Sequence, residues 1–172
     1  MFSLQNAQAK LDSINIRSEL HGDEHVPACD LKFTLTTGNE ILSEFDPTLR
    51  SFLYKAADSE NLDLADQAGD PDRLSVLAHP LLAMPLKWAA EFAGYTLHFH
   101  WGASGKNDIE LEAKQIDGFK FDCKDGGSVD VSWRVIVHPS EREVGRLCGM
   151  VQQTVEISLL EPDADAPLRD AA

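Results

Sequence analysis

The stretch that decides the fold is FKFDCKDGGSVDVSWRVIV, residues 119–137. Apolar residues occupy every second position on both sides of Asp125-Gly126-Gly127, which is the two-residue period of strands with one buried face. The three central residues tolerate positive φ and are typical of hairpin turns. The sequence therefore predicts two long antiparallel strands joined by a tight turn.

A helix and a last strand follow this hairpin. Ser140 and Glu143 have the spacing of a capping box at a helix start. The residues after them recur at helical spacing and predict one apolar helix face, formed by Val144, Leu147, Cys148 and Val151. Alternation at Val155, Ile157 and Leu159 then predicts a final strand.

Upstream of the hairpin, alternation predicts strands at Leu11–Leu20 and Leu31–Leu35 with a polar loop, His21–Pro27, between them. Ile41, Leu42 and Phe45 have helical spacing. Asp46-Pro47 indicates the start of a helix that ends near Ala57.

Further strands are expected on both sides of residue 95. Prolines confine any strand within 74–82 to a sheet edge. Alternation predicts strands at 84–88, 95–101 and 109–113, and the phase slips at Ile116–Gly118, where we expect a bulge or corner. The fold class expected is β-rich α+β, a largely antiparallel sandwich or partly open barrel with two short helices. Residues 1–160 would form one domain and 161–172 an acidic flexible tail.

Acidic residues dominate the charge of the chain. Its 172 residues contain 15 Lys and Arg against 29 Asp and Glu, a net charge of −14. This balance argues against a large electrostatic footprint on nucleic acid or membrane, although it permits a local basic face. Six acids and no base lie between Asp58 and Asp72. With no apolar membrane span or signal peptide evident, we expect a cytoplasmic location.

Two histidines suggest a metal site that the rest of the sequence does not complete. Leu97-His-Phe-His-Trp-Gly102 resembles the zinc-binding strand of the α-carbonic anhydrases, in which alternate histidines project together. The third histidine of that pattern is missing, since 109–123 contains none. We therefore predict no metal and no cofactor, and place His98 and His100 on the polar face of a strand.

Catalytic signatures are not found in the sequence. It contains no Gly-x-Ser-x-Gly elbow, no Cys–His signature and no phosphate-binding Gly-rich loop. Cys29, Cys123 and Cys148 form no short-spaced pair and are expected to be reduced thiols. We predict that the protein is not an enzyme and has no catalytic residues.

Four basic residues fall on or beside the outward phase of the long hairpin: Lys114, Lys120, Lys124 and Arg134. They predict a local positive strip that binds single-stranded DNA, with solvated lysines as the plain alternative. Because Phe119, Phe121 and Trp133 have the opposite phase, a base-stacking residue would have to come from a loop or from Tyr54.

Four stretches of the chain resemble a family of uncharacterised proteins encoded by tailed phages and prophages. They are Ser13–Gly22, Val26–Phe33, Phe45–Arg50, and the segment from Gly126-Gly127 to Gln152-Gln153. Genes of this family often lie beside recombination genes such as exonucleases and annealing proteins. The resemblance implies a role in phage DNA transactions in the cytoplasm of a bacterial host cell, and it implies no catalytic residues.

Three functions are consistent with these patterns. The first is a non-enzymatic accessory to phage DNA recombination or replication that binds single-stranded DNA or a protein of DNA metabolism. The second is an acidic inhibitor of a host defence complex, in which Asp58–Asp72 imitates a row of phosphates. The third is a zinc-dependent enzyme that uses His98 and His100. No membrane partner is expected, and an oligomer is possible.

Overall fold

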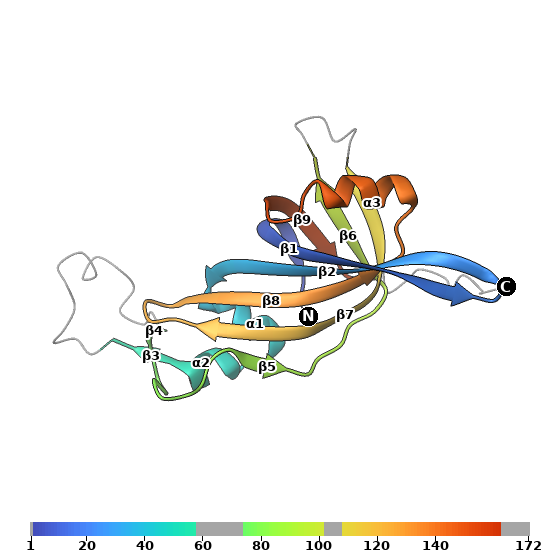
Figure 1. The fold of residues 1–172 in the computed structure, drawn as a ribbon. Helices are drawn as coiled ribbons and strands as arrows, with labels where there is room; N and C mark the ends of the chain where they lie inside the picture. Colours follow the sequence, from blue (N-terminus) through green and yellow to red (C-terminus); the bar gives the residue numbers. More distant parts are fainter. Residues whose placement is uncertain (1, 58–73, 102–107, 163–172) are drawn as a thin grey trace.

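Six antiparallel strands close into a barrel in the computed structural model, which describes residues 2–57, 74–101 and 108–162 (Figure 1). The strands are β1 (Leu4–His21), β2 (Glu24–Gly38), β6 (Tyr95–His100), β7 (Ile109–Cys123), β8 (Ser128–Val137) and β9 (Thr154–Leu160). Their order is β1-β2-β8-β7-β6-β9, and β9 pairs with β1. The β-rich, antiparallel fold class is confirmed, and the barrel is closed.

The remaining elements are short. β5 (Leu86–Trp88) pairs with β7 outside the barrel, and β3 (Tyr54–Ala56) pairs with β4 (Leu74–Leu77) in a separate two-stranded sheet. The helices are η1 (Asn39–Ile41), α1 (Leu42–Phe45), α2 (Leu49–Leu53) and α3 (Glu141–Cys148). Three α-helices and one 3-10 turn thus appear in the described residues, where two short helices were expected.

The hairpin that decides the fold has the expected register. Cys123 pairs with Val129 and Phe121 with Val131 around the turn, in which Gly126 and Gly127 have positive φ. The phase slip at 116–118 is a register shift between Asp117 and Lys120 with Gly118 at φ +67°. Every apolar residue on the inward phase of this hairpin is buried.

Aromatic rings fill the barrel beneath α1. Phe2 is fully buried and stacks on Phe45 with ring centroids 4.9 Å apart. Its edge also meets Phe119 at 5.3 Å and Trp133 at 5.7 Å. Because aromatic pairs in such offset and edge geometries add to the gain from apolar burial, this cluster ties the N-terminus and α1 to the central hairpin.

The expected loop at His21–Pro27 is wrong. β1 continues to His21 and β2 begins at Glu24, so only Gly22 and Asp23 form the turn. Backbone pairing overrode the polar composition of this segment. Before Cys29, β2 pairs only with β1, and the two strands extend beyond the barrel as a two-stranded ribbon (Figure 1).

Two helices differ in detail from expectation. The capping box at Ser140 and Glu143 is confirmed, but Cys148 is exposed, so the apolar face of α3 is carried by Val144 and Leu147, with Met150 beyond the helix. α2 begins at Leu49, because the Asp46 carboxylate accepts hydrogen bonds from the backbone and hydroxyl of Thr48. It ends at Leu53, short of Ala57, where the chain turns into β3.

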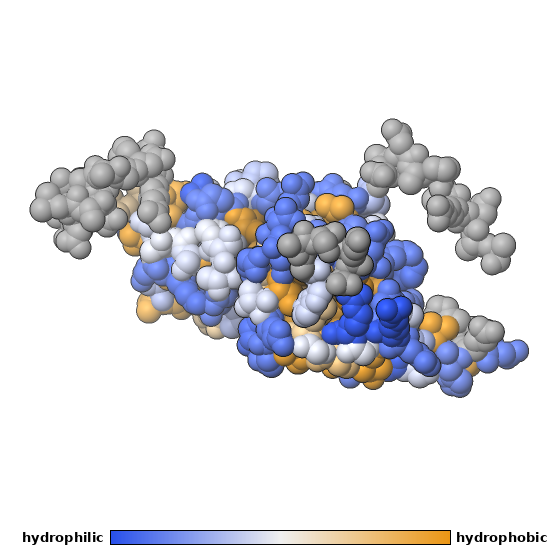
Figure 2. Space-filling view, turned by 90° about the horizontal axis from the view of Figure 1, so that it is seen from above, coloured by the Kyte–Doolittle hydropathy of each residue, from blue (hydrophilic) through white to orange (hydrophobic). Residues whose placement is uncertain are grey.

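Hydrophilic residues dominate the face of the molecule seen from above, and its apolar residues form small separate areas (Figure 2). None of the helices in the described ranges is long and apolar enough to cross a membrane.

Candidate nucleic-acid interface

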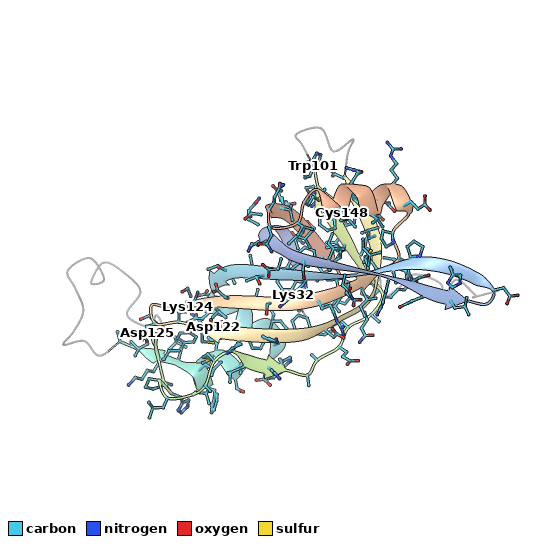
Figure 3. The ribbon with its side chains drawn as sticks, in the orientation of Figure 1. Lys32, Trp101, Asp122, Lys124, Asp125 and Cys148 are labelled. Carbon is cyan, nitrogen blue, oxygen red and sulfur yellow. The ribbon has the colours of Figure 1, made fainter. Side chains whose placement is uncertain are left out.

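The structure separates the four basic residues of the predicted strip. Lys124 lies beside the β7–β8 turn (Figure 3). It is well apart from Lys32, a further basic residue in the middle of the sheet. Lys124 forms an ion pair with Asp130, while Lys114 pairs with Glu112 at 2.7 Å. Lys120 and Arg134 are brought together, and both line a groove on the outer face of the barrel.

This groove has a volume of about 620 Å³ and crosses the outer face of β1, β2, β8, β7 and β5. The segment Ala89–Glu91 after β5 also lines it. Its polar and charged residues come mainly from outward strand positions, and they are Ser13, Asn15, Asp30, Lys32, Lys87, Glu91, Asp117, Lys120 and Arg134.

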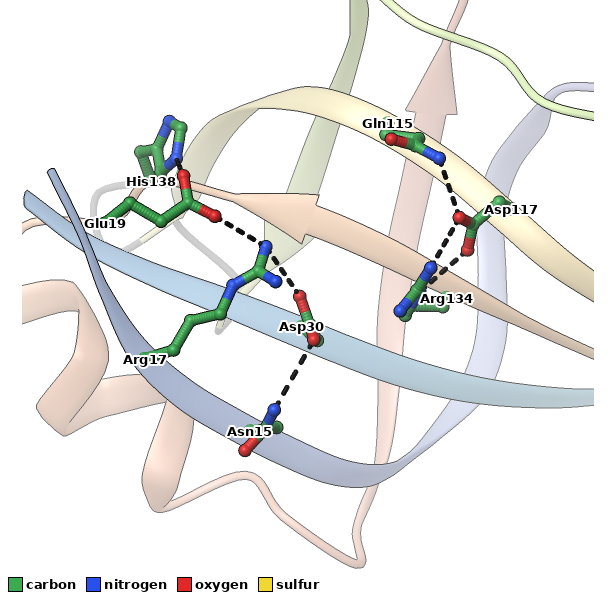
Figure 4. A network of polar contacts seen from close by, with 8 residues as sticks. All are labelled: Asn15, Arg17, Glu19, Asp30, Gln115, Asp117, Arg134 and His138. Carbon is green, nitrogen blue, oxygen red and sulfur yellow. Dashed lines mark hydrogen bonds and ion pairs between the residues drawn. The ribbon is translucent and has the colours of Figure 1, made fainter. Parts of the chain in front are cut away.

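Arg134 is held in place by an acid. Its guanidinium donates to both oxygens of Asp117, with Nε–Oδ1 at 2.7 Å and Nη2–Oδ2 at 2.6 Å (Figure 4). Gln115 donates to the same carboxylate at 2.8 Å. The bond to Asp117 raises the pKa of Arg134. This pair neutralises itself, so Arg134 positions Asp117 more than it attracts an external anion.

A second acid of the groove is also occupied. Asp30 forms an ion pair with Arg17 at 3.2 Å and accepts a hydrogen bond from Asn15 at 3.5 Å (Figure 4). Glu91 is exposed at the groove margin and adds to the negative field around Arg134. Two of the three carboxylates lining the groove are therefore already paired with arginines.

Three lysines of the groove have no such partner. Within the described residues, Lys32, Lys87 and Lys120 form no ion pair or side-chain hydrogen bond. Lys87 on β5 and Lys120 on β7 face each other as direct cross-strand partners. Lys32 on β2 faces Arg134 on β8 in the same way. Like charges that face each other across a ladder repel. Because these lysines have no acidic partners in the described part of the chain, the groove has an excess of positive charge in an otherwise acidic protein.

The groove also offers a partly accessible ring. Trp88 lines it and is half-buried, with Phe121 behind it at 6.2 Å between ring centroids. Tyr54 is unsuitable for base stacking, because it is buried and its hydroxyl bonds the β7–β8 turn. The suggestion that Tyr54 could stack a base is wrong.

Sequence reasoning missed Lys32, Lys87 and Trp88. Their outward or marginal phases could be inferred from the alternation at 31–35 and 84–88. The pairings that bring them together, β5 with β7 and β2 with β8, join residues distant in sequence. No local pattern specifies such pairings, although Lys32 and Lys87, at outward phase in separate strands, were a usable signal.

The histidines of the suggested zinc strand have other partners. His98 and His100 lie on the outer face of β6, with rings 6.3 Å apart. His98 faces Glu110 at 3.9 Å, and His100 contacts Ser158 and Asp108. Nowhere in the described ranges do three or more His, Cys, Asp or Glu side chains converge in a way that could hold a metal ion.

The acidic segment Asp58–Asp72 lies outside the described residues, as does most of the acidic tail. The three cysteines are free thiols. Burial raises the pKa of Cys29 and Cys123. Comparison of the chain with family models, with curated proteins and with solved structures finds no match.

Proposed function

We propose that this protein binds a single strand of nucleic acid in the groove between β5 and β1, as an accessory to phage DNA recombination or replication. The observation that carries the proposal is the set of three lysines without acidic partners around one groove, on a protein of net charge −14. Phosphates are the ligands that would relieve the repulsion between Lys87 and Lys120.

The dimensions of the groove suit a strand. From β5 through β7 and β8 to β2 there are three strand spacings, about 14 Å in all. Phosphates along one strand of a duplex are about 3.4 Å apart along the axis. The lysines can therefore contact more than one phosphate of the same strand.

Trp88 supplies the second requirement of a single-strand site. Proteins of this kind combine a positive groove with aromatic faces on which bases stack. Trp88 is half-buried in the groove wall beside Lys87, so a base next to a bound phosphate can contact its exposed part. Stacking of this kind tolerates any base, which suits an accessory that acts on DNA of any sequence.

The test is fluorescence anisotropy with a labelled single-stranded oligonucleotide at low and moderate salt. Wild-type protein should bind, and the affinity should fall steeply with salt because counterions are released. The double variant Lys87→Glu/Lys120→Glu should bind at least about tenfold more weakly and show a shallower salt slope.

The matched control is Lys55→Glu/Lys114→Glu, which changes net charge by the same amount at positions outside the groove. It should retain near wild-type affinity. Equal loss of binding in both double variants would show that only overall charge matters. Failure of the wild-type protein to bind at low salt would remove the proposal.

A further inference from the structure

A second polar cluster lies on the outer barrel face formed by β1, β9, β6 and the start of β7, and none of its residues lines the groove. Ser158 Oγ lies 2.7 Å from His100 Nε2. His100 Nδ1 lies 3.5 Å from Asp108 Oδ2. A hydroxyl, an imidazole and a carboxylate thus follow one another in the order that activates a serine.

The Asp108 carboxylate lies where it can orient the His100 ring. The Trp101 N–H donates to Asp108 Oδ1 at 2.9 Å, and this bond, followed by His100, lowers the pKa of Asp108. An ionised carboxylate only accepts hydrogen bonds, so it suits the His100 tautomer with the proton on Nδ1. Its Nε2 then has a free lone pair, which faces the Ser158 hydroxyl.

Ser158 itself is held from the other side by a bulge in β1. Asn6 has φ +48°, and the β1–β9 register shifts between Leu4 and Ala7. The displaced Asn6 N–H donates to Ser158 Oγ at 3.0 Å. A left-handed non-glycine residue and a bulge are features that recur next to active sites. Only 6% of Ser158 is exposed, so the oxygen is partly withdrawn from water.

We propose that Ser158 is a nucleophilic serine, with His100 as its general base and Asp108 as a positioning residue, and that carboxylic esters are its substrates. Ser158 Oγ attacks the ester carbonyl carbon while its proton passes to His100 Nε2. When the tetrahedral adduct collapses, the bond to the leaving alcohol breaks and the alcohol takes that proton. Water, deprotonated by His100, then hydrolyses the acyl-serine to a carboxylic acid and free Ser158.

Asn6 contacts Ser158 Oγ twice in the resting site. Its N–H donates to Oγ at 3.0 Å, and its side-chain oxygen can accept from the Ser158 hydroxyl at 3.4 Å. The hydroxyl has one proton, and His100 Nε2, at 2.7 Å from Oγ, is the nearer of its two acceptors.

The experiment is labelling of the folded protein with a fluorophosphonate probe, followed by mapping of the modified peptide by mass spectrometry. We expect Ser158 to react at least tenfold faster than the exposed Ser51. His100→Ala should abolish the preference, and Asp108→Asn should reduce the rate at least tenfold. His98→Ala is the matched control, because His98 lies on the same strand face and is not hydrogen-bonded to Ser158; it should label normally.

A second measurement addresses turnover. Hydrolysis of p-nitrophenyl acetate should show a burst of p-nitrophenolate that is lost in Ser158→Ala, with circular dichroism used to verify folding. If Ser158 in the folded wild-type protein reacts no faster than Ser51, its contacts only satisfy hydrogen bonds and the proposal is overturned. Both readouts are independent of oligonucleotide binding.

Discussion

Arg134 on β8 and Asp117 on β7 are cross-strand partners, and two parallel hydrogen bonds join the guanidinium to the buried carboxylate. Of the four basic residues in the groove, Arg134 is therefore held in an ion pair within the fold, whereas the three lysines are not. Any test of ligand binding that mutates Arg134 also removes the partner of a buried carboxylate, whereas changes at Lys87 and Lys120 break no ion pair among the described residues.

Replacement of Arg134 by alanine should lower the free energy of unfolding by about 1–3 kcal/mol, because Asp117 remains buried with only Gln115 as a partner. Urea denaturation monitored by tryptophan fluorescence measures this. Arg134→Lys keeps the charge but not the planar pair of donors, so its loss should be intermediate. An unchanged stability in Arg134→Ala would show that water replaces the guanidinium fully.

Lys87→Gln should have opposite effects on stability and on binding. Removal of one of two facing like charges should raise the free energy of unfolding by about 0.2–1 kcal/mol, while oligonucleotide affinity falls. Urea denaturation and anisotropy on the same preparation provide the two values. Lys55→Gln should leave both unchanged. If Lys87→Gln lowers stability, the two lysines do not repel each other, and a phosphate would relieve no repulsion there.

Tyr54→Phe should lower the free energy of unfolding by about 1–3 kcal/mol. The hydroxyl donates to the Ser128 carbonyl at 2.9 Å and accepts from the Lys124 N–H at 3.1 Å, so it connects β3 to the β7–β8 turn. Burial raises the pKa of this tyrosine, in keeping with a neutral, hydrogen-bonded hydroxyl. Thermal denaturation is the measurement. Phe52→Tyr, at an exposed ring, should have little effect and controls for general aromatic changes.

The contribution of Asp130 to the free energy of unfolding should depend on pH in the acid range. Its hydrogen bonds to Lys124 and then Thr36 lower its pKa in the folded state. The contribution is therefore complete above the unfolded pKa of about 3.9 and is lost as pH falls through the lower folded value. At neutral pH, Asp130→Asn should cost about 0.5–1 kcal/mol.

Urea denaturation of Asp130→Asn and wild type at several pH values measures this difference, which should shrink below about pH 4 and then disappear. Asp23→Asn, in the β1–β2 turn, is the control for loss of a negative charge. A difference that persists unchanged into strong acid would contradict the ionic origin of the contribution.

Local features of the fold were predictable from sequence, and pairings between distant segments were not. The turn at Gly126-Gly127, the bulge at Gly118 and the capping box at Ser140 each depend on a few adjacent residues. The closure of the barrel depends on β8 pairing with both β2 and β7, and on β9 pairing with both β1 and β6. Alternation alone is compatible with a sandwich, an open barrel or a closed one.

The same limit applies to the candidate sites. Lys114 and Lys124 have the right phase for a basic strip, but Glu112 and Asp130 bind them. Strand phase does not reveal which acid neutralises which base. The contact between His100 and Ser158 joins residues 58 positions apart, so no motif search on one stretch could find it.

The closure by β9 has a consequence for folding in the cell. The contact between Asn6 and Ser158 spans 152 residues, and β9 is the last of the described strands in the chain. Chains grow at about 5–20 residues per second, so β1 and β6 are synthesised well before the strand that lies between them. Until then the nascent chain carries two unpaired strand edges that other chains could join. Shielding of these edges by chaperones should therefore matter most until β9 is synthesised and docks between β1 and β6.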